Sequence, residues 1–283
     1  MSAQIEVKNL FHNFGSKNVL KGIELQIEKG EIFGLLGPSG AGKTTIINIL
    51  TGQLNASAGE CQINGVDSNK LSGEHHKKIG VMMDHFGLYE RMTCFDNLRF
   101  YEMLDGNKCI GIDSVLSKVG LLNSKKVQVT NLSKGMKNRL SFARAILRSP
   151  EILFLDEPTS GLDPNTAKEI HKLILEEKKK GTTIFLTTHN MHEAETLCDN
   201  VALLYEGRIV EYGKPKELCR KYNNQKKYKI HLKSGEDLEL GHETEDIEKI
   251  VFYFQNNELE TIHTTEPDLE MIFMALTGGE LNK

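Results

Sequence analysis

Apolar and polar residues alternate in three early segments of the chain. The alternating apolar positions are Ile5 and Val7, then Ile23, Leu25 and Ile27, then Cys61 and Ile63. Alternation places every second side chain on one face of an extended backbone. Each segment therefore predicts a β-strand with one buried face.

Three short runs are almost continuously apolar instead. They are EIFGLLG (31–37), EILFLD (151–156) and TTIFLTT (182–188). Strands buried on both faces of a parallel sheet have this composition. One helix is predicted after Lys43 and closes near Gly52, and another begins at Asp163-Pro164 and stops at Gly181, since Asp favours the N-cap and Pro the first helical position. Strands that alternate with helices predict an α/β domain with a mostly parallel sheet.

The pattern changes twice along the chain. Strand signals disappear over residues 86–150 and helical ones dominate, which predicts a helical subdomain inserted in an α/β domain of residues 1–213. After Gly213 a basic stretch (214–233) is followed by an acidic one (236–280). KKYKIHLKSGEDLEL (226–240) predicts two strands around Ser234-Gly235, and two further helices are expected. Residues 214–283 therefore predict a small α+β C-terminal appendage.

Composition narrows the class of protein. Apolar residues make up 39%, charged residues 26% and the net charge is −4, which fits a globular protein and argues against nucleic acid as a partner. The apolar runs are far shorter than the roughly 20 residues that span a bilayer, and the first ten residues do not read as a secretory signal. The five cysteines form no CxxC pair, so we expect reduced thiols in a cytosolic compartment.

The stretch GPSGAGKTT follows the first buried strand and precedes a predicted helix. It fits the phosphate-loop pattern G-x-x-x-x-G-K-[ST]. The glycines let backbone N–H groups curl around phosphate oxygens, and the helix N-terminus adds partial positive charge. We expect Lys43 to reach the β- and γ-phosphates and the Thr44 hydroxyl to ligate Mg²⁺. The candidate nucleotide-binding residues here are Gly37, Pro38, Ser39, Gly40, Ala41, Gly42, Lys43, Thr44 and Thr45.

Three polar residues stand at the ends of the next two buried strands. Asp156 emerges at the carboxyl end of its strand, where α/β sheets bind ligands, and can hold Mg²⁺. Glu157 is the candidate to orient or deprotonate an attacking water, and a solvated acid at a strand end is the alternative. His189 ends the following strand, and on geometry alone a histidine satisfied at the sheet edge is an equally good interpretation.

A second helix start lies in NLSKGMKNRLSFARAILRSP (131–150). Ser133 can act as its N-cap, and Gly135 permits close backbone approach. An apolar stripe predicts that the helix packs on its own subunit, while the basic side chains Lys134, Lys137 and Arg139 are interpreted as mostly solvated. The stripe consists of Met136, Leu140, Ala143 and Leu147.

These motifs, in this order, resemble the nucleotide-binding subunit of ATP-binding cassette (ABC) transporters over about residues 3–213. The resemblance rests on the phosphate loop, the signature LSKGM (132–136), ILFLDE (152–157), the SGLD loop (160–163) and His189. It implies a phosphate-loop ATPase that uses ATP and Mg²⁺. In this family two cassettes pair head to tail, and each ATP lies between the phosphate loop of one and the signature of the other, with Ser133 and Gly135 facing the partner's nucleotide.

The resemblance also implies roles for other residues. Phe14 occupies the position of the aromatic that stacks on adenine, although a core Phe is the alternative. Asp163 resembles a residue that contacts the opposite site, which is compatible with an N-cap, and His189 resembles the residue that contacts the γ-phosphate. One departure is Asp84, which stands where the family has a Gln that touches Mg²⁺ and the attacking water. Ionised Asp can ligate Mg²⁺ but cannot donate a hydrogen bond.

LSKGM and the ending PDLEMIFMALTG (267–278) resemble exporters called ABC-2 type, which move drugs, peptides or lipids. The resemblance implies a second cassette, identical or homologous, an integral membrane permease as a separate subunit, and a peripheral place on the cytoplasmic face of the cell membrane. Non-transport cassette proteins remain the alternative. Translation factors usually carry two cassettes in one chain, chromosome ATPases carry a long coiled coil, and a degenerate module would lack residues such as Lys43 or Glu157.

Overall fold

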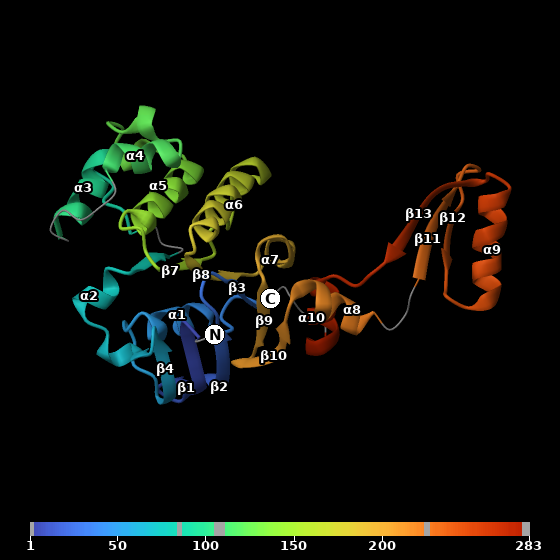
Figure 1. Cartoon of the computed structure of the whole chain (residues 1–283), viewed down its shortest axis with the longest axis horizontal. Helices are drawn as coiled ribbons and strands as arrows, with labels where there is room; N and C mark the ends of the chain where they lie inside the picture. The colour runs from blue at the N-terminus through green and yellow to red at the C-terminus, as the bar shows by residue number, and fades with distance from the viewer. Residues whose placement is uncertain (1–2, 84–86, 105–110, 224–226, 279–283) are drawn as a thin grey trace. The chain divides into compact units, whose positions relative to one another are not determined.

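The computed structural model describes residues 3–83, 87–104, 111–223 and 227–278. The chain divides into two compact units, residues 1–212 and residues 213–281, and each is described by itself (Figure 1). In the part of the chain that the structure describes, we find no helix that is both long and apolar enough to cross a membrane.

The strands predicted from alternation form one antiparallel sheet in unit 1. It contains β1 (Ile5–Phe14), β2 (Lys17–Ile27), β4 (Ala58–Ile63) and β5 (Val66–Asp67) in the order β2-β1-β4-β5. Ile5 pairs with both Ile27 and Ile63, so the alternating apolar residues share a register and a buried face. This sheet carries Phe14 at the end of β1.

The continuous apolar runs form the centre of a second, six-stranded sheet. Its order is β10 (Arg208–Gly213), β9 (Asn200–Tyr205), β3 (Ile32–Leu36), β8 (Thr183–Thr188), β7 (Ile152–Asp156) and β6 (Ile79–Met82). The pairs β9–β3, β3–β8, β8–β7 and β7–β6 are parallel. Every residue of β3, β7 and β8 is buried. The carboxyl ends of these strands meet at one edge, which gathers the polar residues that follow them.

Helices surround this sheet. They are α1 (Lys43–Leu50), α2 (Gly73–His76), α6 (Pro164–Lys179) and α7 (Met191–Leu197), with a short 3₁₀ turn at Ser68–Lys70 before α2. Two other 3₁₀ turns, Leu122–Ser124 and Val129–Asn131, belong to the helical segment that precedes β7. Between residues 87 and 150 the described part of the chain forms helices and no strand, namely α3 (Cys94–Leu104), α4 (Ile112–Lys118) and α5 (Lys134–Ile146).

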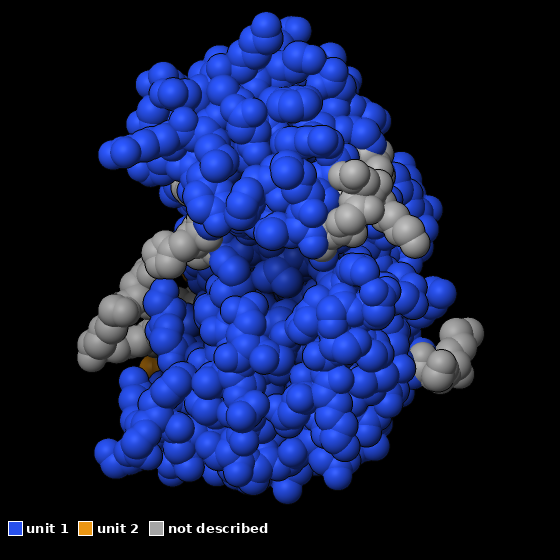
Figure 2. Space-filling model, turned by 90° about the vertical axis from the view of Figure 1, so that its left-hand side faces the viewer, with its two compact units in different colours: residues 1–212, 282 blue, residues 213–281, 283 orange. Residues whose placement is uncertain are grey.

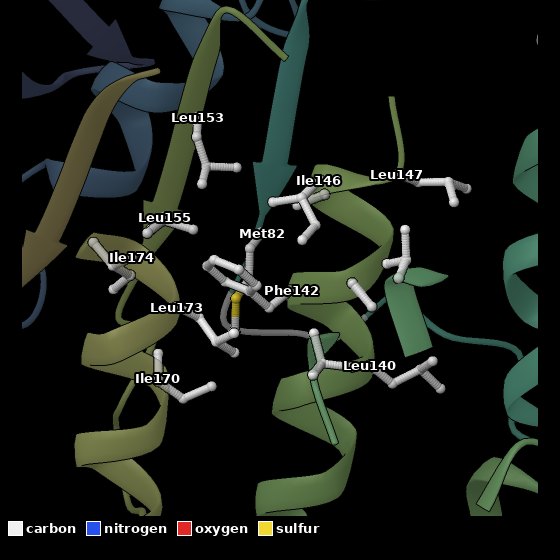
Figure 3. Packing of buried hydrophobic residues seen from close by; sticks show 14 of the residues in the cluster. Met82, Leu140, Phe142, Ile146, Leu147, Leu153, Leu155, Ile170, Leu173 and Ile174 are labelled. Atoms are coloured by element: carbon white, nitrogen blue, oxygen red, sulfur yellow. The ribbon is translucent and has the colours of Figure 1, made fainter. Parts of the chain in front are cut away.

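Helix α5 is anchored by its apolar stripe. Leu140, Ala143 and Leu147 are buried and Met136 packs against the same core. In Figure 3, Phe142 of α5, Leu173 of α6 and Met82 of β6 point toward one another. Figure 2 shows the side of unit 1 on which α2 and α3 lie, where its surface is hollowed between an upper and a lower part.

The described residues of unit 2 form a three-stranded antiparallel sheet and three helices. The elements are α8 (Pro215–Tyr222), β11 (Lys227–Leu232), β12 (Asp237–Leu240), α9 (Thr244–Gln255), β13 (Leu259–Thr265) and α10 (Leu269–Thr277). The strand order is β12-β11-β13. Ile230, Leu232 and Leu240 form its small core, against which Ile250 and Tyr253 of α9 pack.

Candidate active site

The loop Gly37–Gly42 joins β3 to α1 and needs glycine at two places for different reasons. A Cβ on Gly37 would lie 2.3 Å from the carbonyl oxygen of Leu204, so no larger residue fits. Gly42 is the N-cap of α1 and has φ +113°, a conformation that L side chains rarely adopt. These two glycines therefore let the loop pack closely on its own subunit and turn directly into α1, whose N-terminal N–H groups can bind phosphate.

Lys43 is the first residue of α1 and is only 6% exposed. Its ammonium donates to the carbonyl oxygens of Gly37 (2.6 Å) and Pro38 (3.3 Å) and lies 3.1 Å from Oε1 of Glu157. A buried ammonium needs such partners, because desolvation without them is costly. The side chain is thus held against the phosphate loop and the carboxyl end of β7.

Asp156 ends β7 and is 3% exposed. Its Oδ2 accepts a hydrogen bond from the Thr44 hydroxyl (2.8 Å), and its Oδ1 accepts one from the hydroxyl of Thr187 on β8. The described residues contain no group of three or more His, Cys, Asp or Glu that could hold a metal ion alone. One carboxylate and one hydroxyl fit Mg²⁺, which takes few protein ligands and completes its shell with phosphate oxygens and water.

Glu157 has a left-handed backbone, with φ +50°. Its N–H donates to the Thr187 carbonyl oxygen (3.0 Å), which anchors this turn to β8. Its carboxylate lies between Lys43 and His189, with Oε2 2.7 Å from Nδ1 of His189. The His189 side chain is 55% exposed, so it reaches into solvent beside the buried Lys43. Strained backbones of this kind concentrate at functional sites.

A cavity of about 410 Å³ opens over these residues. Its lining comprises Phe14, Lys17, Val19, Ser39, Gly40, Gly42, Lys43, Thr44, Thr45, Asp156 and Glu157. Phe14 is 54% exposed and meets the ring of buried His12 edge-on, with centroids 4.6 Å apart, so it is not a core residue. Lys17 was missed from the sequence, although Gly15 and Ser16 form the turn that pairs it with Phe14.

The signature residues do not line this cavity. Ser133 is the N-cap of α5, where its Oγ accepts from the Met136 N–H (3.2 Å). A Cβ on Gly135 would lie 2.7 Å from Cγ2 of Thr166 on α6, so the glycine also permits close packing of two helices. Lys134 is exposed, while Lys137 and Arg139 are half-buried. The chain thus presents a second helix N-terminus at another place on unit 1.

Asp163 is the N-cap of α6. Its carboxylate accepts hydrogen bonds from the Thr166 hydroxyl (2.6 Å) and from the N–H groups of Asn165 and Thr166 (both 3.1 Å). These bonds, led by that from the Thr166 hydroxyl, lower the pKa of Asp163. Asp84 lies outside the described residues. The strand before it, β6, runs parallel to β7 and ends at the same sheet edge as Asp156.

Comparisons with known proteins place this geometry in a family. The pattern that defines the ABC transporter family matches residues 20–160. The chain is 36% identical to a fluoroquinolones export ATP-binding protein of Mycobacterium tuberculosis, over 98% of this chain and 94% of that protein. The chain belongs to the ABC transporter family. It is an ATP-binding subunit with ATPase activity, and the predicted α/β phosphate-loop fold is confirmed.

Two further proteins are similar to this chain over the cassette part of their sequences or structures. The chain is 36% identical to the lantibiotic transport ATP-binding protein SrtF of Streptococcus pyogenes, over 78% of this chain and 96% of that protein. The ATP-binding cassette MJ0796, solved as a dimer in a post-hydrolysis state with ADP and Pi, matches at 26% identity with a TM-score of 0.67, over 74% of this chain and 98% of that one. Both matches cover nearly all of the other protein but only about three quarters of this chain, so this chain is longer than the part it shares with them.

Proposed function

We propose that this cassette hydrolyses ATP between two head-to-tail copies, or between itself and a homologous cassette, and so drives a separate membrane permease that exports a drug, peptide or lipid-like compound. The observation that carries the proposal is the convergence of Lys43, Thr44, Asp156, Glu157 and His189 at one edge of the sheet, beside the cavity that begins at Phe14.

Binding follows from the cavity. Adenine stacks on the exposed ring of Phe14, and the triphosphate runs along the loop 37–45, where Lys43 and the N-terminus of α1 supply positive charge. Lys43 already has an anionic neighbour in Glu157, at 3.1 Å, so its ammonium exchanges one negative partner for another when phosphate arrives. Ser39, Gly40, Gly42 and Thr45 line the same path.

Hydrolysis depends on the carboxylate of Glu157. It accepts the proton of the attacking water, or orients that water by a hydrogen bond. His189, 2.7 Å from it, holds the carboxylate, and we expect its other ring nitrogen to donate to the γ-phosphate. Thr44 and Asp156 would hold Mg²⁺, which neutralises charge on the phosphates. Asp84 remains a proposed further ligand of Mg²⁺ or water.

The position of the N-terminus of α5 supports a dimer. Ser133 and Gly135 stand at the start of α5 but do not line the phosphate-loop cavity of their own chain. We infer that they bind the γ-phosphate held by a partner cassette, with Asp163 near the shared boundary. The similar cassette MJ0796 is described as a dimer with ADP and Pi, which supports this arrangement.

The names of two relatives support a role in transport, and one of them specifies export. One is a fluoroquinolones export protein and the other a lantibiotic transport protein. As in the ABC transporter family to which the relatives belong, we propose that the permease is a separate chain and that the cassette is a peripheral subunit on the cytoplasmic face. Closure of two cassettes on ATP would then be converted by the permease into alternating access.

Replacing Glu157 with Gln tests the catalytic role. Gln keeps the shape but cannot accept a proton, so hydrolysis should fall by about 10²–10⁴-fold while ATP still binds. ATPase assays with and without the permease, and nucleotide binding by filter assay, measure the two effects. The variant should accumulate as a dimer with ATP and Mg²⁺ in size-exclusion chromatography.

Glu151→Gln is the matched control. Glu151 lies at the opposite end of the same strand, where it forms an exposed ion pair with Lys78 at 2.9 Å. Its loss should leave the hydrolysis rate near that of the wild type. A wild-type rate of hydrolysis by Glu157→Gln would contradict the proposed role of Glu157. A monomer at saturating ATP with the permease present would contradict the dimer.

A further inference from the structure

Glu193 lies in the first turn of α7 and is buried, with 2% of the residue exposed. Its Oε1 accepts a hydrogen bond from the Thr159 hydroxyl at 2.7 Å and lies 2.9 Å from Nε2 of His171 on α6. Its Oε2 is buried without a hydrogen-bond partner among the described residues. A buried carboxyl oxygen without a partner lowers the stability of the fold, so the presence of Glu193 calls for an explanation other than stability.

Helix capping does not explain this side chain. Glu at the third position of a helix normally folds back to the N–H of the N-cap residue. Here the N-cap is Asn190, whose side chain accepts from the Glu193 N–H (3.1 Å), but the Asn190 N–H donates to the Thr188 hydroxyl (3.0 Å). Because that donor is already satisfied, the Glu193 carboxyl crosses to another segment.

The segment it reaches carries the catalytic glutamate. Thr159 lies two residues after Glu157, and Asn190 directly follows His189. These contacts close a ring. The loop from Glu157 leads to Thr159, which bonds Glu193 on α7, and α7 begins directly after His189. Nδ1 of His189 lies 2.7 Å from Glu157 and completes the ring. Pro158 is held from the signature helix as well, since its carbonyl oxygen accepts from Nδ2 of buried Asn138 at 2.7 Å.

We propose that Glu193 is a positioning residue, which holds the loop after β7 and the start of α7 in the arrangement that brings Glu157 and His189 together. This inference rests on the proposed roles of Glu157 and His189. Glu157 has a strained left-handed backbone, so its side chain direction depends on neighbours that fix the loop. Glu193 acts on hydrolysis through Thr159, without touching ATP itself.

The test compares four full-length variants, Glu193→Ala, Glu193→Gln, Thr159→Val and the double variant Thr159→Val/Glu193→Ala. Ala and Val break the Thr159–Glu193 bond, and misplacement of a reacting group on the scale of 1 Å lowers rates by up to about 100-fold. We expect both singles to lower kcat about 10- to 100-fold with little change in KM for ATP. Gln keeps an acceptor oxygen and should retain most of the activity.

Both single variants break the Thr159–Glu193 bond, and Glu193→Ala also removes the contact with His171, so the double variant should be no slower than Glu193→Ala alone. His192→Ala is the control, since His192 is exposed on the same helix and should keep the wild-type rate. Rates are taken per folded molecule, well below the Tm of each variant. Thr159→Val, which is nearly isosteric, decides the matter if Glu193→Ala does not fold.

Wild-type kcat in Thr159→Val or in folded Glu193→Ala, whatever their Tm, would overturn the inference and leave Glu193 a structural residue. Multiplying effects in the double variant would also overturn it, because the two side chains would then act independently. Glu157→Gln separates this from the proposed function. If that variant is inactive and Thr159→Val keeps the wild-type kcat, only the positioning role fails.

Discussion

Glu157 is fixed from three directions by chemically different neighbours. Its left-handed backbone is held by the Thr187 carbonyl oxygen, and its carboxylate lies between an ammonium and an imidazole. A side chain in this backbone region costs about 1–2 kcal/mol relative to a right-handed one. The rest of the fold must therefore offset this cost, and the resulting backbone turn holds the carboxylate beside Lys43 of the phosphate loop.

Cys61 shows the opposite case, because its surroundings lower the reactivity of its thiol. It lies on β4 and is 4% exposed, and burial, with a smaller effect from Asp67, raises the pKa of its thiol to about 12. Only the thiolate is alkylated, so at pH 8 iodoacetamide should modify Cys61 roughly a thousandfold more slowly in native than in denatured protein. Peptide mass spectrometry after timed labelling measures both rates, and equal rates would contradict the burial of this thiol.

Residues within a motif were easier to predict than their partners. Lys43, Asp156 and Glu157 follow from spacing, because a buried strand delivers whatever comes next to the ligand-binding edge. Thr187, Lys17 and Glu193 did not, because each reaches the site from another strand or helix. Their contacts depend on register, such as Asp156 beside Thr187 and Phe14 opposite Lys17, and register is set by the folded sheet.

At the scale of elements, the patterns that worked were those in which burial dominates. The three fully buried strands and the caps of α6 and α5 were predicted from sequence and are found. Strand β13 was missed, and two further helices were expected after Gly213 where the described residues form three. β13 is largely exposed along LETIHTT, so its apolar positions give no clear period. Strands β9 and β10 were also not predicted.

Helix packing at the signature gives an element-scale prediction. Gly135→Ala should be destabilised by about 1–3 kcal/mol, because the new Cβ would lie 2.7 Å from Cγ2 of Thr166. Thr166→Ser removes that methyl group and keeps the hydroxyl that bonds Asp163. In the Thr166→Ser background, Gly135→Ala should be neutral or stabilising, because Ala favours helices over Gly by about 1 kcal/mol.

Urea denaturation measures this cycle, with Thr166→Ser alone as the control. Hydrolysis separates the two reasons for the glycine. If Gly135 also needs open backbone toward a partner's γ-phosphate, the double variant should be stable and slow. A stable and fully active double variant would assign Gly135 to helix packing alone.

At the scale of the whole molecule, the phosphate loop and the start of α5 lie at different places on unit 1. The cavity that holds the phosphate loop is lined without Ser133 or Gly135. Beyond the cassette, unit 2 has its own small core and its own sheet. The match to the fluoroquinolones export protein spans 98% of the chain, whereas SrtF is 96% covered by a match to only 78% of it. SrtF therefore has little length beyond the part that it shares with this chain.

Mixing two damaged chains tests whether the halves combine. Lys43→Ala removes the ammonium of the phosphate loop, and Ser133→Arg places a bulky cation at the start of α5. Each homodimer has two damaged sites, but a mixed dimer has one site with both halves intact and one with both damaged. The mixture should hydrolyse ATP faster than either variant alone, up to about half the wild-type rate per mixed dimer if sites act independently.

Mixing Lys43→Ala with Glu157→Gln is the control, since both damage the same half and leave no intact site in any pairing. ATPase rates at several mixing ratios, with the permease present, should peak near equal amounts for the first pair and stay flat for the second. A flat response from both pairs would mean that one chain completes its own site, or that neither site fires unless its neighbour is intact. Titrating wild type with Lys43→Ala distinguishes these, because obligate firing at both sites lowers the rate as the square of the wild-type fraction, and independent sites lower it linearly.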